Sequence, residues 1–151
     1  MTAQTMQIGN RPCRIYGEAH AKYLLLQMTG EHEQQSIDHE VAAIAQSGRN
    51  FLFAAIPVES WNDALSPWKA PAVWGKQGFG GNAADTLCFL TERVIPTLKQ
   101  QLRLPEDIKI ILGGYSLAGL PNRHGALSET YSPRWRSDPR QCHRTCRTGV
   151  G

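Results

Sequence analysis

Three short apolar runs, each bounded by turn-forming residues, constrain the fold more than any other feature of the sequence. They are residues 23–28 (YLLLQM), 51–56 (FLFAAI) and 108–112 (IKIIL). Strands that are apolar on both faces are typical of sheets that helices cover on both sides. The connections between the runs are long enough for parallel crossovers. We therefore expect an α/β fold, with a three-layer, mostly parallel sheet.

Two segments between these runs have helical periodicity. In the first, apolar residues recur from Ile37 through Val41 at helical spacing, and Gly48 follows where a glycine commonly ends a helix. In the second, Asn82 is placed to cap a helix, and Pro96 should bend that helix because proline lacks a backbone donor. The apolar face of the second helix is predicted to consist of Leu87, Leu90, Val94, Leu98 and Leu102.

Two further segments carry weaker signals. Residues 5–8 and 12–16 are expected to form a hairpin, because Gly9-Asn10 supplies the positive φ that tight turns need. Residues 58–81 fit neither period and contain three tryptophans and a glycine-rich end. We expect a long loop there, which is either functional or a surface loop held by its aromatic side chains without a ligand.

The third apolar run leads directly into Gly114-Tyr115-Ser116-Leu117-Ala118. A nucleophilic hydroxyl on a sharp strand-to-helix turn needs small residues two positions to either side, and Gly114 and Ala118 meet that need. A helix beginning at Leu117 would direct free N–H groups toward the oxygen anion formed in acyl transfer. The segment is thus interpreted as a nucleophile turn, with an ordinary strand-to-helix turn as the alternative.

With these features, residues 5–120 resemble the α/β-hydrolase superfamily, specifically its bacterial esterase-like branch. The turn at residues 114–119 resembles the family's nucleophile elbow, with Ala118 in place of the more usual glycine. Residues 28–32 fall where the family has its oxyanion loop, and residues 61–68 fall where a loop often faces the substrate. The resemblance implies an incomplete α/β-hydrolase core over residues 1–120.

The resemblance also implies roles for individual residues. Ser116 would be the nucleophile, and the amides of Glu31 and Leu117 would be the oxyanion donors; a one-residue slip would replace Glu31 by Gly30. The implied activity is serine-dependent hydrolysis of a small-molecule carboxylic ester or similar acyl compound, without a cofactor or metal. In the family the base and the acid follow the serine, so His32, which precedes it, is expected to be solvated or to stabilise its loop.

The chain changes character after Leu120. Residues 1–120 contain 10 Lys and Arg against 11 Asp and Glu, whereas residues 121–151 contain six Arg and two acidic residues. The only aliphatic side chains larger than alanine in that tail are Leu127 and Val150. Such a segment buries too little apolar area to offset the entropy of ordering it, so we expect a disordered basic tail.

Three interpretations of the tail remain open. The first is an out-of-frame or truncated product, which the abrupt change inside a motif favours. The second is a basic arm for nucleic acid, which lacks any helical or aromatic spacing to organise it. The third is a zinc site, which lacks a recurring Cys-x-x-Cys pair; its ligands would be His124, Cys142, His143 and Cys146. We therefore expect neither a nucleic-acid partner nor a metal.

Two functional hypotheses follow. The chain is a serine esterase by family whose acid and base are missing, or it is a non-catalytic truncated fragment with no independent activity. No run approaches the roughly 20 apolar residues of a membrane span, and the first residues lack the pattern of a secretory signal. The cysteine spacing shows no disulfide framework. We therefore expect reduced thiols, a cytoplasmic location and no membrane partner.

Overall fold

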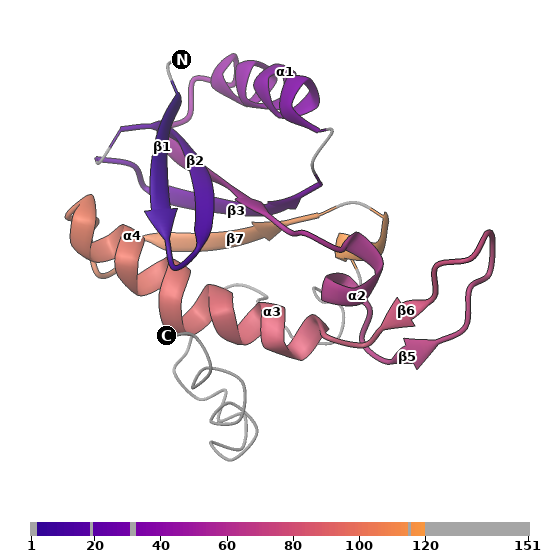
Figure 1. Ribbon diagram of the computed structural model, residues 1–151. Coiled ribbons are helices and arrows are strands. Elements are labelled where there is room, and N and C mark those ends of the chain that lie inside the picture. The colour runs from indigo at the N-terminus through magenta and orange to yellow at the C-terminus, as the bar shows by residue number, and fades with distance from the viewer. Residues whose placement is uncertain (1–2, 19, 31–32, 115, 120–151) are drawn as a thin grey trace.

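The computed structural model describes residues 3–18, 20–30, 33–114 and 116–119 (Figure 1). The strands are β1 (Ala3–Ile8), β2 (Arg11–Gly17), β3 (Tyr23–Thr29), β4 (Phe51–Pro57), β5 (Lys69–Ala70), β6 (Phe79–Gly80) and β7 (Lys109–Gly113). The α-helices are α1 (Gln34–Ala45), α2 (Trp61–Leu65), α3 (Ala83–Phe89) and α4 (Ile95–Gln101). A π-helical segment, Leu90–Val94, joins α3 to α4, and a 3-10 turn, Ser116–Gly119, follows β7.

The main sheet has five strands in the order β1-β2-β4-β3-β7. Strand β3 pairs in parallel with β4 and β7, whereas β2 pairs antiparallel with β1 and β4. The α/β class is confirmed, but the sheet is mixed and the prediction of a mostly parallel sheet is wrong. The reason is the amino-terminal hairpin: Gly9, with φ 62°, closes a tight turn, and both of its strands then join the sheet antiparallel.

The sheet carries a separate apolar core on each face, which makes three layers. Along β4 the side chains alternate, so that Phe53 contributes to the core beneath α1 and Leu52 to the core beneath α3 and α4. Helix α1 buries Ile37 and Val41 against the first face. Leu98 of α4 is fully buried against the second. Figure 1 shows α1 on one side of the sheet and the α3–α4 helix on the other.

The long helix between β6 and β7 is irregular where the sequence predicts a bend. The ring of Pro96 crowds the preceding turn and has no N–H to donate, and the chain responds with the π-helical segment immediately before α4. Asn82 lies at the helix start as predicted, but its side chain makes no capping hydrogen bond. Gly48, with φ 68°, follows α1 as expected.

Strand β7 is less buried than its sequence suggests. Leu112 is 9% exposed, but Ile111, whose side chain points to the opposite face, is 45% exposed. The prediction of a strand buried on both faces is therefore wrong for β7 within the described residues. The physical reason is position, since β7 ends the order of the described strands and α1 packs against β2, β3 and β4 instead.

Residues 58–81 are partly ordered rather than a structureless loop. They contain α2 and the antiparallel pair β5–β6, which projects from the body of the molecule (Figure 1). The aromatic side chains do not hold the segment together, because Trp74 is 90% exposed and Trp68 is 61% exposed. Polar contacts at its base do so: the Gly81 N–H donates to the Ser66 hydroxyl at 2.7 Å.

Three remaining expectations meet the structure only in part. Cys13 is a free, buried thiol, whereas Cys88 is in a disulfide, so the expectation of reduced thiols is wrong for Cys88. No helix in the described part of the chain is long and apolar enough to cross a membrane. The prediction of a disordered tail, and the candidate metal ligands in it, lie in residues 121–151, outside the described residues.

Candidate functional site

The candidate site lies at one edge of the sheet, where three parallel strands end. The register places Thr29 opposite Pro57 across β3 and β4, and Gln27 opposite Gly113 across β3 and β7. The carboxyl ends of β3, β4 and β7 therefore meet at the same edge (Figure 1). Ser116 follows Gly113 by three residues, and Gly30 follows Gln27 by three residues, so both extend beyond this edge. Ligands of α/β sheets bind preferentially at such an edge.

Ser116 has a backbone conformation that serine rarely adopts. Its φ is 52°, and in the described residues only one other non-glycine residue, Arg103, has a positive φ. The Ser116 side chain is exposed. Strained backbone of this kind costs about 1–3 kcal/mol and clusters at functional sites. The strand-to-helix turn thus presents an exposed hydroxyl from a strained position.

The small residues that flank the serine are in contact with each other. A Cβ atom built at Gly114 would lie 2.5 Å from the carbonyl oxygen of Ala118 and 2.7 Å from its carbonyl carbon. Ala118 is fully buried in the core beneath α3 and α4, so its backbone has no room to retreat. The turn therefore requires glycine at position 114, as the sequence pattern predicts.

Leu117 belongs to the 3-10 turn that begins at Ser116. Its side chain is half-buried against the same core as Ala118. N–H groups in a first helical turn have no partner within the helix, which suits the Leu117 amide to an acceptor beside the Ser116 hydroxyl. The turn begins one residue earlier than predicted, and it is 3-10 rather than α-helical over the described residues.

The other predicted oxyanion donor, Glu31, lies outside the described residues, as does His32. The flanking residues are described and are joined to each other. The Gly30 N–H donates to the Glu33 carboxylate at 2.7 Å, and the Glu33 N–H donates to the Gly30 carbonyl at 3.3 Å. Gly30 is therefore already engaged, which disfavours the one-residue slip that would make its amide the donor.

Glu33 was not predicted to have a role, although a sequence signal for it exists. The Gly30-x-x-Glu33 spacing is that of a capping box, in which a glutamate three residues on accepts from the amide at the helix entry. Glu33 precedes α1, and its carbonyl accepts from the Ile37 N–H at 3.0 Å. One residue thus fixes both the end of the 30–33 turn and the start of α1.

Helix α2 also lies at this edge of the sheet. It contacts the 3-10 turn that carries Ser116, and a Cβ atom at Gly30 would lie 3.8 Å from the Trp61 ring. The Ser60 hydroxyl donates to the Asp63 carboxylate at 2.8 Å, so Asp63 has a local partner. The half-buried Trp61 is the apolar group nearest to the 30–33 turn.

No histidine in the described ranges can serve Ser116 as a base. His20 precedes the first residue of β3, a strand of seven residues, so about 20 Å separates it from the carboxyl edge at the usual rise per residue. Its carbonyl accepts from the Asn50 side chain at 3.0 Å. His39 is exposed on α1, the helix that covers the sheet away from the Ser116 turn.

The comparisons with known proteins place the fold among serine hydrolases. No family model matches the chain, and no curated protein matches its sequence. An IroE-like serine hydrolase from Shewanella oneidensis is similar in structure with a TM-score of 0.66 and 17% identity, over 82% of this chain and 45% of that one.

Two further solved structures are similar. The siderophore hydrolase EstA from Aspergillus nidulans has a TM-score of 0.51 and 17% identity, over 82% of this chain and 51% of that one. An uncharacterised protein from Capnocytophaga ochracea has a TM-score of 0.55 and 14% identity, over 85% of this chain and 37% of that one. This chain thus spans about half or less of each structure, and the likeness shows a shared fold.

Proposed function

We propose that this chain carries the nucleophile of a serine hydrolase that acts on carboxylic esters or similar acyl compounds. The observation that supports this most is the exposed Ser116 at φ 52°, on a strand-to-helix turn at the carboxyl edge of the sheet. The fold shared with serine hydrolases supports the same assignment. No cofactor takes part in the proposed reaction.

The proposed chemistry begins with attack of the Ser116 oxygen on the acyl carbon of the ester. The carbonyl oxygen then becomes an anion, which the amides of Leu117 and Glu31 would stabilise by hydrogen bonding. Glu33 acts as a positioning residue, because its bond to the Gly30 N–H holds the turn from which Glu31 projects. The alcohol leaves as the acyl–Ser116 ester forms.

The proton of the Ser116 hydroxyl must pass to a base, and the base must later activate water. The described histidines lie away from Ser116, so this chain is proposed to acylate slowly and to turn over negligibly. The second hypothesis, a fragment with no activity at all, is favoured by the same observation. The two hypotheses differ in whether Ser116 reacts faster than an ordinary surface serine.

Labelling with an alkyl fluorophosphonate, followed by mass spectrometry of the peptides, distinguishes them. A single oxyanion donor is worth about 10²–10³ in rate, so Ser116 should label at least about 10²-fold faster than Ser47, an exposed serine after α1. Ser116→Ala should remove this adduct and Ser47→Ala should not. Equal labelling of Ser116 and Ser47 would show an ordinary turn.

Turnover is measured separately with p-nitrophenyl acetate. We expect the rate with the protein to equal the rate in buffer, because no described group can deprotonate water at the site. Clear turnover that Ser116→Ala abolishes would contradict the missing base while supporting the nucleophile. Turnover that survives Ser116→Ala would instead assign any activity to another group.

A further inference from the structure

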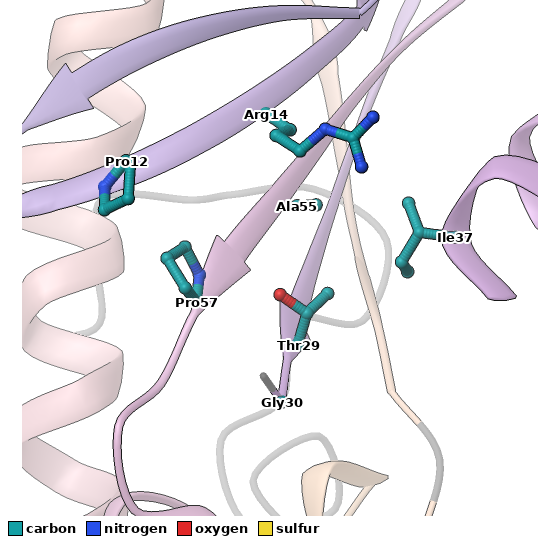
Figure 2. A pocket seen from close by; sticks show the side chains of 7 residues that line it. All are labelled: Pro12, Arg14, Thr29, Gly30, Ile37, Ala55 and Pro57. Atoms are coloured by element: carbon teal, nitrogen blue, oxygen red, sulfur yellow. The ribbon is translucent and has the colours of Figure 1, made fainter. Parts of the chain in front are cut away.

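A second cavity-lining cluster lies apart from the Ser116 turn, between the sheet and α1. It encloses about 160 Å³, and its walls come from four elements (Figure 2). The lining includes Pro12 and Arg14 of β2, Thr29 of β3, Ala55 and Pro57 of β4, and Ile37 of α1. Small side chains and rigid proline rings occupy the sheet here, and Ile37 alone does not fill the space beneath the first turns of α1.

Arg14 supplies an unpaired cationic donor in this cluster. Its Nη2 donates to the Asp38 carboxylate at 3.2 Å, and its guanidinium lies 5.0 Å from the centroid of the Tyr16 ring. Its Nη1 is buried and has no hydrogen-bond partner among the described residues. Leaving a buried donor unpaired costs about 1–3 kcal/mol, and more for a charged group. Such donors are nearly always satisfied, by solvent or by a ligand where the protein offers none.

Asp38 does not satisfy the whole guanidinium. The same Asp38 oxygen that pairs with Arg14 also accepts from the Tyr16 hydroxyl at 2.8 Å, and the Asp38 side chain is 48% exposed. A guanidinium has five N–H donors in a fixed fork. One edge of the fork therefore faces Asp38, and Nη1 remains for an acceptor that enters the cavity.

We propose that this cavity binds the carboxylate of a small organic acid. Arg14 Nη1 donates to a carboxylate oxygen, and the Thr29 hydroxyl is the second polar side-chain group of the lining. Pro12, Pro57 and Ile37 surround the short hydrocarbon part. An empty apolar cavity of about 150 Å³ accommodates benzene, so an acid of about six heavy atoms, such as butyrate, fits the volume.

The charges favour a monoanion over phosphate. Arg14 contributes one positive charge, and Asp38 opposes it at 3.2 Å, so a dianion would meet repulsion that a carboxylate largely escapes. The apolar walls also offer a dianion nothing in return for its lost hydration. The assignment does not depend on Ser116, and the Ser116→Ala protein should bind the acid unchanged.

The test is a titration of the chain with butyrate at neutral pH, followed by amide NMR shifts of Ala55 and Ile37. We expect saturable binding, and Arg14→Met should weaken it by about 10–100-fold, the worth of a hydrogen bond to a charged group. Met keeps an apolar stem against Tyr16. The matched control Arg49→Met removes an exposed guanidinium after α1 and should leave the affinity unchanged.

Two further variants separate ligand binding from a structural role of the Arg14–Asp38 pair. Asp38→Asn keeps an acceptor for Tyr16 but removes the competing charge, so it should tighten butyrate binding several-fold. Ala55→Leu fills the cavity and should abolish binding while Arg14 stays intact. Each variant is compared with the parent by its urea midpoint, so that loss of the fold is not mistaken for loss of binding.

The proposal is overturned by any of three results. These are no saturable butyrate binding in the folded parent chain, equal binding in the parent and Arg14→Met, or weaker binding in Asp38→Asn with the fold intact. Phosphate serves as the comparison anion, and phosphate binding as tight as that of butyrate would also overturn the assignment to a carboxylate.

Discussion

Replacing Ser116 by glycine should stabilise the protein, because the serine is held in a conformation that costs free energy. A non-glycine residue in the left-handed region costs roughly 1–2 kcal/mol, and Ser116 has φ 52°. Glycine removes that cost but loses about 0.5–1 kcal/mol more backbone entropy on folding. The side chain is exposed, so its removal leaves no buried group unpaired. The free energy of unfolding should rise by about 0.5–1 kcal/mol.

Urea unfolding measures this change directly. With a slope of about 1.5 kcal/mol/M for a chain of this size, the midpoint should rise by about 0.3–0.7 M. Arg103→Gly provides a matched positive reference, because Arg103 is exposed and has φ 51°. Ser47→Gly provides the opposite reference, since Ser47 lies after α1 without a positive φ and should lose about 0.5–1 kcal/mol.

The order of stabilities decides whether the reasoning holds. Ser116→Gly should follow Arg103→Gly in sign, and Ser116→Val should destabilise because a β-branched side chain fits the left-handed region poorly. If Ser116→Gly lowers the midpoint as Ser47→Gly does, the turn is not strained at Ser116. The argument that stored backbone strain marks this serine as functional would then fail.

Three other outcomes are expected. Gly114→Ala should lower the free energy of unfolding by about 2–3 kcal/mol in the same assay, because its Cβ would lie 2.5 Å from the Ala118 carbonyl oxygen; a loss under about 0.5 kcal/mol would show that the turn can open. Burial raises the pKa of the Cys13 thiol to about 11, so peptide mapping after alkylation at pH 8 should find Cys13 unmodified until urea unfolds the chain. Burial, and secondly the hydrogen bond to Asp38, raise the pKa of Tyr16 to about 12; since the folded pKa exceeds the ordinary value of 10, stability should be intact below pH 10 and fall as the pH rises towards 12, less steeply in Tyr16→Phe.

Much of the fold could be predicted because it follows from local patterns. The apolar runs at 23–28 and 51–56 are the strands β3 and β4, and Gly9 marks the hairpin turn. The bend at Pro96 follows from chemistry within a few residues. The requirement for a small residue at Gly114 is of the same kind, since the group it would strike is four residues away.

What the sequence failed to predict depends on neighbours distant in the chain. The apolar run of β7 does not reveal that Ile111 is exposed, because exposure depends on where β7 lies in the sheet. Likewise β1 and β2 give no sign that their hairpin joins the sheet antiparallel to β4. The exposure of Trp74, in a segment whose aromatics were expected to pack, is a further case.

The sequence by itself determined the α/β class and placed a serine on a turn between β7 and the following segment, because spacing and small residues act over a few positions. Only the tertiary structure decided that Ser116 is held at positive φ, that Glu33 engages the Gly30 amide, and that the described histidines lie away from Ser116. It alone also brought Arg14 beside a cavity with Nη1 unpaired. Such features arise from strand order and from packing between layers, and these are long-range properties that no local pattern encodes.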